Sequence, residues 1–229
     1  MNRAVRTVLI TLVALVGLAT VPTGAAAAAV PKPPRAIVLT VGPSTVGPGQ
    51  PARLNLSLTP NDGGRPKGGT ITWRVGDTVL GTATARSRYT ALVLDDLPLG
   101  TYEVVADYSG DPETAPATSN TVTLTVAPFR TFTDLTRSAA TVPAGNRAEV
   151  KADVRAARWP VEVTGSVSFT ATSSAGTRMG TVPLNTQAGA TWRPLLPAGT
   201  WQITARYNGV EDLYAPSDSA SIAITVTPV

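Results

Sequence analysis

The feature that most constrains this chain is an internal duplication. The segment LPLGTYEVVADYSG at residues 97–110 recurs 99 residues later as LPAGTWQITARYNG at 196–209. Upstream, GTITW at 69–73 matches GSVSF at 165–169 with an offset of 96. Two matched units of about 95 residues, each the size of a small domain, predict two tandem domains and not one.

The offset between the two units grows from 96 to 99, so the second unit carries three extra residues, around 173–176. Because insertions are best tolerated in surface loops, we expect a longer hairpin loop at 172–177. The two units meet at Ala127-Pro128. A linker this short that contains proline predicts limited bending between the domains.

Within each unit, apolar side chains alternate with threonine, serine or charged side chains. In the first unit, 70–75, 101–108 and 121–126 have this period of two, and turn signals such as 61–64 and 76–77 separate the runs. Such a period is typical of half-buried antiparallel strands. About seven strands per unit predict an all-β protein made of two tandem immunoglobulin-like antiparallel β-sandwiches.

The expected domains are 35–127 and 128–229, each with seven strands. In the first domain we expect them at 36–41, 51–59, 69–75, 78–84, 88–94, 100–108 and 119–126. In the second domain we expect them at 130–136, 146–155, 165–171, 177–183, 189–194, 199–207 and 219–226.

Six aromatic side chains are expected to form the structural core. They are Trp73, Tyr102, Tyr108, Phe169, Trp201 and Tyr207. An exposed aromatic platform for a ligand is the alternative interpretation of the tyrosines, but their spacing places them on the inward face. Trp73 and Phe169 occupy the position of the core tryptophan of an immunoglobulin sandwich. Because tryptophan has no hydroxyl group, we expect the tyrosine-corner hydrogen bond to be missing at Trp201.

The order of these motifs resembles the bacterial Ig-like repeats, which occur in tandem in secreted and surface proteins. The matching residues of the first unit are Gly69 to Trp73, Leu80-Gly81-Thr82, Leu97 to Gly110 and Thr121 to Val126. The second unit departs from the pattern at Met179 and Val210, which replace Leu80 and Asp111. The resemblance covers roughly residues 35–229 and implies the fold, but it implies little about function because the motif residues are structural.

Cysteine and histidine are both absent from the chain. Disulfides, thiol nucleophiles, Cys/His zinc sites and histidine-assisted serine hydrolysis are therefore excluded. No phosphate-binding, dinucleotide-binding or hydrolase motif occurs. We expect no enzyme, no catalytic residues, no cofactor and no metal site, with a hydrolase built from Asp, Glu and Ser alone as the competing hypothesis.

Acidic residues cluster at three turns: Asp95-Asp96, Asp111 with Glu113, and Glu211-Asp212. Calcium needs six to eight oxygen ligands, which makes a calcium site at these turns an open alternative to the simpler interpretation as solvated turn residues.

Residues 1–29 have the three regions of a secretory signal peptide. Two arginines precede an apolar run at 8–21, and small residues follow with cleavage options after Ala27, Ala28 or Ala29. The run of about 14 residues is shorter than the roughly 20 needed to span a bilayer, so the mature form is expected not to span the membrane. Residues 30–34, VPKPP, are expected to form a stiff proline-rich leader.

The formal net charge of +4 falls to about +2 without the two arginines of the signal segment. The basic residues are scattered, so we expect no nucleic-acid partner. We expect a secreted or extracellular monomer, free or loosely associated with the cell wall. It would act in adhesion or ligand binding, or as a structural spacer, toward an unknown extracellular protein or glycan. The alternative is an accessory carbohydrate-associated module that works in trans with a polysaccharide-active enzyme. We expect a ligand to contact the end loops or an exposed sheet face, and the candidate loops lie at 61–68, 109–118 and 172–177.

Overall fold

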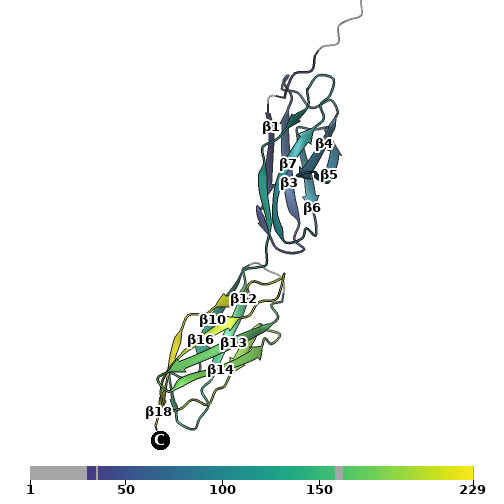
Figure 1. The fold of residues 1–229 in the computed structure, drawn as a ribbon. Coiled ribbons are helices and arrows are strands. Elements are labelled where there is room, and N and C mark those ends of the chain that lie inside the picture. The colour runs from purple at the N-terminus through teal and green to yellow at the C-terminus, as the bar shows by residue number, and fades with distance from the viewer. Residues whose placement is uncertain (1–29, 35, 158–161, 229) are drawn as a thin grey trace, which may run out of the picture. The chain divides into compact units, whose positions relative to one another are not determined.

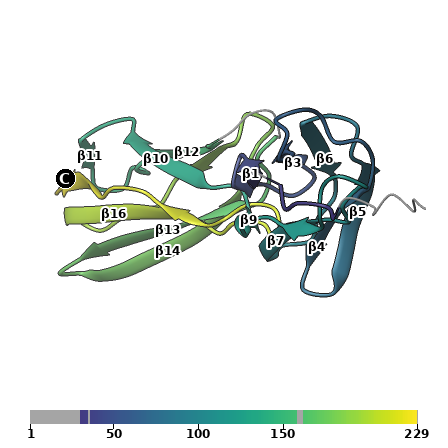
Figure 2. The same cartoon turned by 90° about the horizontal axis from the view of Figure 1, so that it is seen from above.

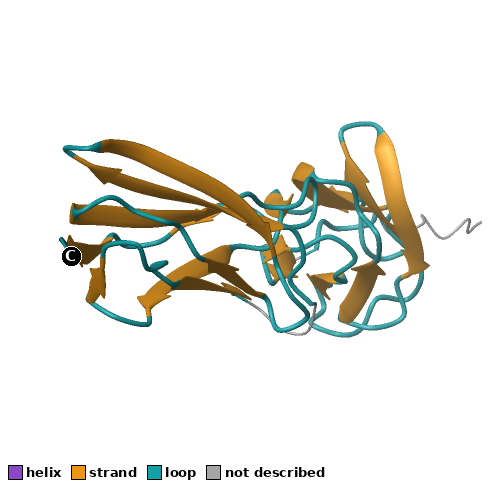
Figure 3. Ribbon diagram, turned by 90° about the horizontal axis from the view of Figure 1, so that it is seen from below, coloured by secondary structure: helices purple, strands orange, loops and turns teal. Residues whose placement is uncertain are grey.

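The computed structural model describes residues 30–34, 36–157 and 162–228, so the predicted signal segment 1–29 lies outside the described part (Figure 1). All elements of the described residues are strands, which confirms the all-β prediction (Figure 3). Among the described residues, no helix has the length and apolar character needed to cross a membrane.

The first sandwich packs a three-stranded sheet of order β1-β3-β6 against a sheet of order β2-β9-β7-β4-β5, in which β8 also pairs with β7. All neighbours are antiparallel except β2 and β9. The strands are β1 (Ala36–Gly42), β2 (Thr45–Val46), β3 (Ala52–Thr59), β4 (Thr70–Val75), β5 (Thr78–Thr84), β6 (Tyr89–Leu94), β7 (Gly100–Tyr108), β8 (Ala117–Thr118) and β9 (Val122–Val126).

The second sandwich repeats this topology, with sheets of order β10-β12-β15 and β11-β18-β16-β13-β14 and with β17 beside β16. Figure 2 shows β10 and β12 in one layer of this sandwich and β13, β14 and β16 in the other. The strands are β10 (Thr131–Arg137), β11 (Thr141–Pro143), β12 (Val150–Ala156), β13 (Ser166–Ser173), β14 (Gly176–Pro183), β15 (Gly189–Trp192), β16 (Gly199–Tyr207), β17 (Ser217–Asp218) and β18 (Ile222–Thr227).

Each strand expected from the sequence corresponds to a strand of the structure. The short strands β2, β8, β11 and β17 were not expected, because two or three residues are too few to show a period of two. β12 begins at Val150, later than the expected 146.

The three extra residues of the second unit lengthen a hairpin and leave its loop unchanged, so the expectation of a longer loop was wrong. β4 and β5 have 6 and 7 residues, whereas β13 and β14 have 8 each. Both hairpins turn through two residues, Gly76-Asp77 and Ser174-Ala175. Extending the ladder pairs the added backbone groups with each other, which a longer loop would leave to solvent.

Trp73 and Phe169 occupy equivalent positions at the centres of the two cores, and both side chains are completely buried. Each lies opposite a glycine on the neighbouring strand, Gly81 for Trp73 and Gly180 for Phe169. In both sandwiches a side chain of the opposite sheet packs onto that glycine, so any larger residue there would collide with it.

The side chain that packs onto the glycine is Leu92 in the first sandwich and Trp192 in the second. The two positions are equivalent, because each pairs with the same position of the neighbouring strand, Leu54 or Val150. Trp192 stacks on Phe169 with ring centroids 5.6 Å apart. At these two equivalent positions the first core has Trp73 and Leu92, and the second core has Phe169 and Trp192. The indole of the pair therefore lies on opposite sheets in the two cores.

The corner hydrogen bond is present in both sandwiches, which corrects the expectation for Trp201. The Tyr102 hydroxyl donates to the carbonyl of Pro98 at 2.6 Å. The Trp201 indole N–H donates to the equivalent carbonyl, that of Pro197, at 2.9 Å. The indole N–H thus replaces the hydroxyl as the donor, and the backbone carbonyl keeps its partner.

Of the six aromatic residues singled out from the sequence, five are buried and Tyr102 is half-buried. The Tyr207 hydroxyl donates to the carbonyl of Thr164 at 2.6 Å. The Tyr108 hydroxyl lies 3.0 Å from the equivalent carbonyl, that of Gly68. Burial raises the pKa of Tyr207 to about 12, so its hydroxyl remains a donor over the physiological pH range.

We predict that Trp73→Phe and Leu92→Trp compensate each other, because together they reproduce the core pair of the second sandwich. Trp73→Phe alone leaves a cavity and should cost roughly 1–3 kcal/mol, reduced by removal of the buried indole N–H, which has no partner. Leu92→Trp alone overfills the core at a cost of about 1–3 kcal/mol. Calorimetry of the single and double variants should show a double variant within about 1 kcal/mol of the parent. Additive losses would show that the two positions do not share one volume.

Candidate functional site

The outward-facing side chains of the β1-β3-β6 sheet form a regular grid, here called the β1-β3-β6 face. Residues directly opposite each other on neighbouring strands share a row, and rows are about 6.7 Å apart. The rows are Val38, Ser57 and Tyr89; Thr40, Asn55 and Ala91; and Gly42, Arg53 and Val93. The grid therefore extends roughly 13 Å along the strands.

The apolar part of this face is unusually open. Tyr89 is 76% exposed, Val93 49% and Val38 44%. Tyr89 and Val38 line a shallow hollow of about 500 Å³ that also includes Arg53 and Asn55. An exposed apolar patch interleaved with a few polar groups is typical of an interaction surface.

The polar part of the face carries the positive charge of Arg53. The Arg53 Nε donates to Asn55 Oδ1 at 2.9 Å, which directs the guanidinium toward the middle row. Among the described residues no carboxylate lies within ion-pair distance of Arg53. Its remaining N–H groups are available to a carboxylate or another anionic group of a partner.

On the matching face of the second sandwich, charged side chains pair with one another. Lys151 pairs with Asp153 at 2.8 Å, and Arg155 pairs with Asp134 at 3.1 Å. The Arg155 guanidinium carbon also lies 4.8 Å from the centroid of the Phe132 ring. Because the two sandwiches have equivalent strands and registers, this difference lies in the side chains alone. Only the first sandwich leaves this face open.

The candidate loops 61–68 and 109–118 are tied to each other. The Lys67 ammonium group lies 2.6 Å from Glu113, and the Lys67 backbone N–H donates to Asp111 Oδ2 at 2.8 Å. Asp111 Oδ1 accepts the N–H groups of Glu113 and Thr114 at 2.9 and 2.7 Å. The Asp111 carboxylate is thus surrounded by hydrogen-bond donors, and its observed role is to fasten the two loops.

The other two acidic pairs lie in turns. Asp96 and Asp212 both have left-handed backbone conformations, with φ of 55° and 58°. Asp95, Asp96, Glu211 and Asp212 are all exposed. Aspartate tolerates this conformation better than most residues, which gives a local reason for its presence at both turns.

The leader and the linker are attached to their sandwiches in the same way. Lys32 forms a parallel bridge with Thr114, and Phe129 forms a parallel bridge with Tyr214, which is 100 residues after Thr114. The Lys32 N–H donates to the Glu113 carbonyl, as the Phe129 N–H does to the Leu213 carbonyl. Within the proline-rich segment 30–34, Lys32 is therefore hydrogen-bonded to the first sandwich through its backbone N–H and through its carbonyl, which accepts the Ala115 N–H.

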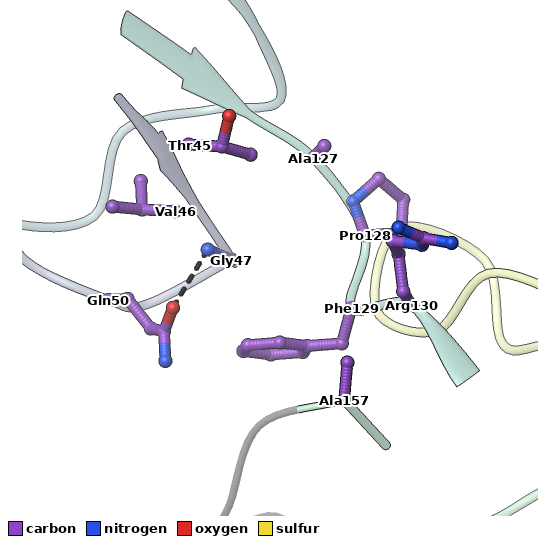
Figure 4. A pocket seen from close by; sticks show the side chains of 9 residues that line it. All are labelled: Thr45, Val46, Gly47, Gln50, Ala127, Pro128, Phe129, Arg130 and Ala157. Carbon is purple, nitrogen blue, oxygen red and sulfur yellow. Dashed lines mark hydrogen bonds between the residues drawn. The ribbon is translucent and has the colours of Figure 1, made fainter. Parts of the chain in front are cut away.

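The linker is fixed on both sides of a single residue. The Ala127 N–H donates to the Val46 carbonyl at 3.0 Å, and the Phe129 N–H donates to the Leu213 carbonyl at 2.8 Å, which leaves only Pro128 between them. Figure 4 shows the linker and the side chains that line a hollow beside it, with the Gly47 N–H donating to Gln50 Oε1 at 2.9 Å.

Comparison with known proteins identifies the family. The family model of the bacterial Ig-like domain (group 3) matches twice, at residues 39–127 and 135–227. The chain belongs to this family. No curated protein sequence matches it. The two bacterial Ig-like domains therefore account for most of the described chain.

Solved structures give only distant similarity to this tandem of bacterial Ig-like domains. The fibronectin(III)-like modules of Clostridium thermocellum CbhA are 13% identical, with 83% of this chain and 95% of that chain covered and a TM-score of 0.35. A putative membrane anchored protein from Corynebacterium diphtheriae is 15% identical, with 84% and 53% covered and a TM-score of 0.37. Similarity at this level gives no information about shared ligands.

An exposed sheet face was one of the two kinds of ligand surface expected from the sequence, but the β1-β3-β6 face was not singled out. The available signal was the strand YTALVL at 89–94, in which apolar residues occupy both alternating sets. Such a strand has apolar side chains on its outer face as well as on its inner one. The neighbours Arg53 and Asn55 come from a strand more than 30 residues away, so only the register reveals the complete grid.

We predict that Asp111 makes the stability of the first sandwich depend on pH in the acid range. Partial burial favours its neutral form, but hydrogen bonds from the backbone of Lys67, Glu113 and Thr114 and from the Tyr108 hydroxyl lower its pKa to about 2. A carboxylate with a depressed pKa stabilises the fold above its unfolded value of about 3.9, and this contribution is lost as the pH falls toward 2.

Calorimetry between pH 5 and pH 2 measures this contribution. Asp111→Asn should be less stable than the parent at pH 5 and should lose less stability on acidification, because asparagine has no proton to gain. Asp95→Asn, in the exposed turn directly after β6, is the control and should follow the parent. Parallel acid losses in the parent and in Asp111→Asn would contradict the prediction.

Proposed function

We propose that this protein is a non-catalytic, secreted or cell-surface protein that binds an extracellular partner through the β1-β3-β6 face of its first sandwich. The second sandwich acts as a spacer. The observation that carries the proposal is the contrast between two equivalent faces. Among the residues that the structure describes, Arg53 has no carboxylate partner on one face, whereas Asp134 and Arg155 are paired on the other.

The chemistry of the face indicates the kind of partner. Tyr89 offers a flat, exposed ring, Arg53 offers a positive charge, and Asn55 and Thr40 offer hydrogen-bonding groups between them. A protein or glycan that carries an anionic group beside a flat apolar surface would satisfy all three. Adhesion or ligand binding fits this arrangement better than a purely structural role for both sandwiches.

A non-catalytic role agrees with the structural contacts of the side chains whose pKa values are shifted. The pKa of Asp107 is lowered by hydrogen bonds from Arg74 and Thr118, and that of Asp111 by the loop contacts described above. The tyrosines with raised pKa values are buried, and their hydroxyl groups lie against backbone carbonyls. These groups stabilise loops and sandwich ends, and the chain has no histidine or cysteine to perform the usual proton transfer or nucleophilic steps.

Glycan and extracellular-protein arrays probed with the chain from residue 30 onward test the proposal. We expect binding above background that Arg53→Gln weakens by roughly tenfold or more, since a charge-assisted hydrogen bond contributes about 1.5–3 kcal/mol. Val38→Lys should also weaken binding, because it places an ammonium group in the apolar row beside Tyr89.

Variants of the other face provide the control. Arg155→Gln and Phe132→Ala alter the equivalent face of the second sandwich and should leave binding unchanged. Binding lost equally in both sets, or absent from both arrays, would contradict a binding role for the β1-β3-β6 face and would leave only the spacer role.

A further inference from the structure

The outer edge of β6 is open in the described chain. β6 is the last strand of the β1-β3-β6 sheet, and its sequence YTALVL contains no charge, proline or glycine. Edge strands are normally protected by short length, charges, proline or a covering segment. At the opposite edge of the same sheet, the Asn120 amide binds the N–H and the carbonyl of Leu39 at 2.9 and 3.0 Å. β6 has no such cover among the described residues.

The hydrogen-bond pattern shows which backbone groups point to this edge. The Leu58 N–H donates to the Arg88 carbonyl at 2.8 Å, so Arg88 is directed toward β3. Along an antiparallel strand, the N–H and carbonyl groups of successive residues point alternately to one side and to the other. The N–H and carbonyl groups of Tyr89, Ala91 and Val93 therefore point away from β3, and their side chains lie on the β1-β3-β6 face. The Tyr89 N–H has one long contact of 3.4 Å with the hydroxyl of Ser87.

We propose that β6 pairs in antiparallel fashion with β6 of a second copy of this chain, with the two-fold axis at Ala91. This register places the open groups of Ala91 opposite those of Ala91 in the second copy, and those of Tyr89 opposite those of Val93. Every open N–H along the strand then meets a carbonyl. On the outer face, Tyr89 of each copy packs beside Val93 of the other, which is a favourable aromatic and β-branched cross-strand pair.

The charges that flank β6 favour the same arrangement. Arg86 and Arg88 precede the strand, and Asp95 and Asp96 follow it. None of the four forms an ion pair with another described residue. Antiparallel pairing brings the basic flank of each copy against the acidic flank of the other, whereas parallel pairing would oppose like charges.

The second sandwich has no equivalent edge. β15 has 4 residues where β6 has 6, and Arg193-Pro194 follows it directly. Gln187-Ala188 precedes β15, so the second sandwich has neither a basic flank before this strand nor an acidic flank after it. The pairing is therefore specific to the first sandwich. It joins two β1-β3-β6 faces into one continuous six-stranded surface. The proposed dimer differs from the monomer expected from the sequence.

Sedimentation velocity of the chain from residue 30 onward tests the pairing. A small edge contact should give a reversible dimer with a dissociation constant of roughly 10 µM to 1 mM, weakened by added salt. Ala91→Pro removes an N–H that β3 does not use, so it should weaken the dimer at least about tenfold while the sandwich stays folded. Thr191→Pro, at the equivalent position of β15, should dimerise like the parent.

Charge-reversed chains test the antiparallel orientation and do not depend on the proline variant. Arg86→Glu and Asp95→Lys should each dimerise less well alone, because each opposes like charges, and an equimolar mixture of the two should form a heterodimer. A parent that stays monomeric to about 1 mM overturns the proposal. Unchanged dimerisation of Ala91→Pro overturns it as well, as does a mixture that associates no better than its components.

Discussion

Each sandwich depends on an aromatic side chain that fills the space between its two sheets, above a glycine on the neighbouring strand. No disulfide can support this contact, because the chain has no cysteine. A domain of this size has a net stability of only roughly 5–15 kcal/mol, so burial of one indole accounts for a substantial fraction of it. The contact above the glycine was preserved without its residues, since Trp73 packs with Leu92 there in one core and Phe169 with the partly buried Trp192 in the other.

The polar contacts at the ends of the sandwiches are likewise preserved although the residues that make them differ. A hydroxyl from Tyr102 and an indole N–H from Trp201 donate to the same backbone carbonyl position. What the two sandwiches share there is a side-chain donor within hydrogen-bond distance of that carbonyl. The Asp111 contacts that join the loops 61–68 and 109–118 have no counterpart in the second sandwich, where Val210 takes the place of Asp111. The loops have therefore diverged more than the cores.

The sequence was sufficient for the parts of the fold that depend on local alternation. The strand positions, the two-domain division and the central positions of Trp73 and Phe169 all follow from the period of two and from the repeat. Features set by distant partners were not predictable. Asp111 meets Lys67 across 44 residues, and Arg53 joins Tyr89 only through the register of β3 and β6. The hairpin insertion was misplaced because a residue count cannot distinguish a longer loop from longer strands.

The duplicated sandwiches share their core positions and differ in their surfaces, from which we infer that the first sandwich alone makes contacts with other molecules. Amide NMR spectra of the isotopically labelled chain, recorded on dilution from about 1 mM, test this most directly. The account predicts concentration-dependent shifts at 86–96 and on the adjoining strand β3, with the equivalent residues 187–194 unchanged. Shifts centred on the second sandwich, or none in either, would contradict it.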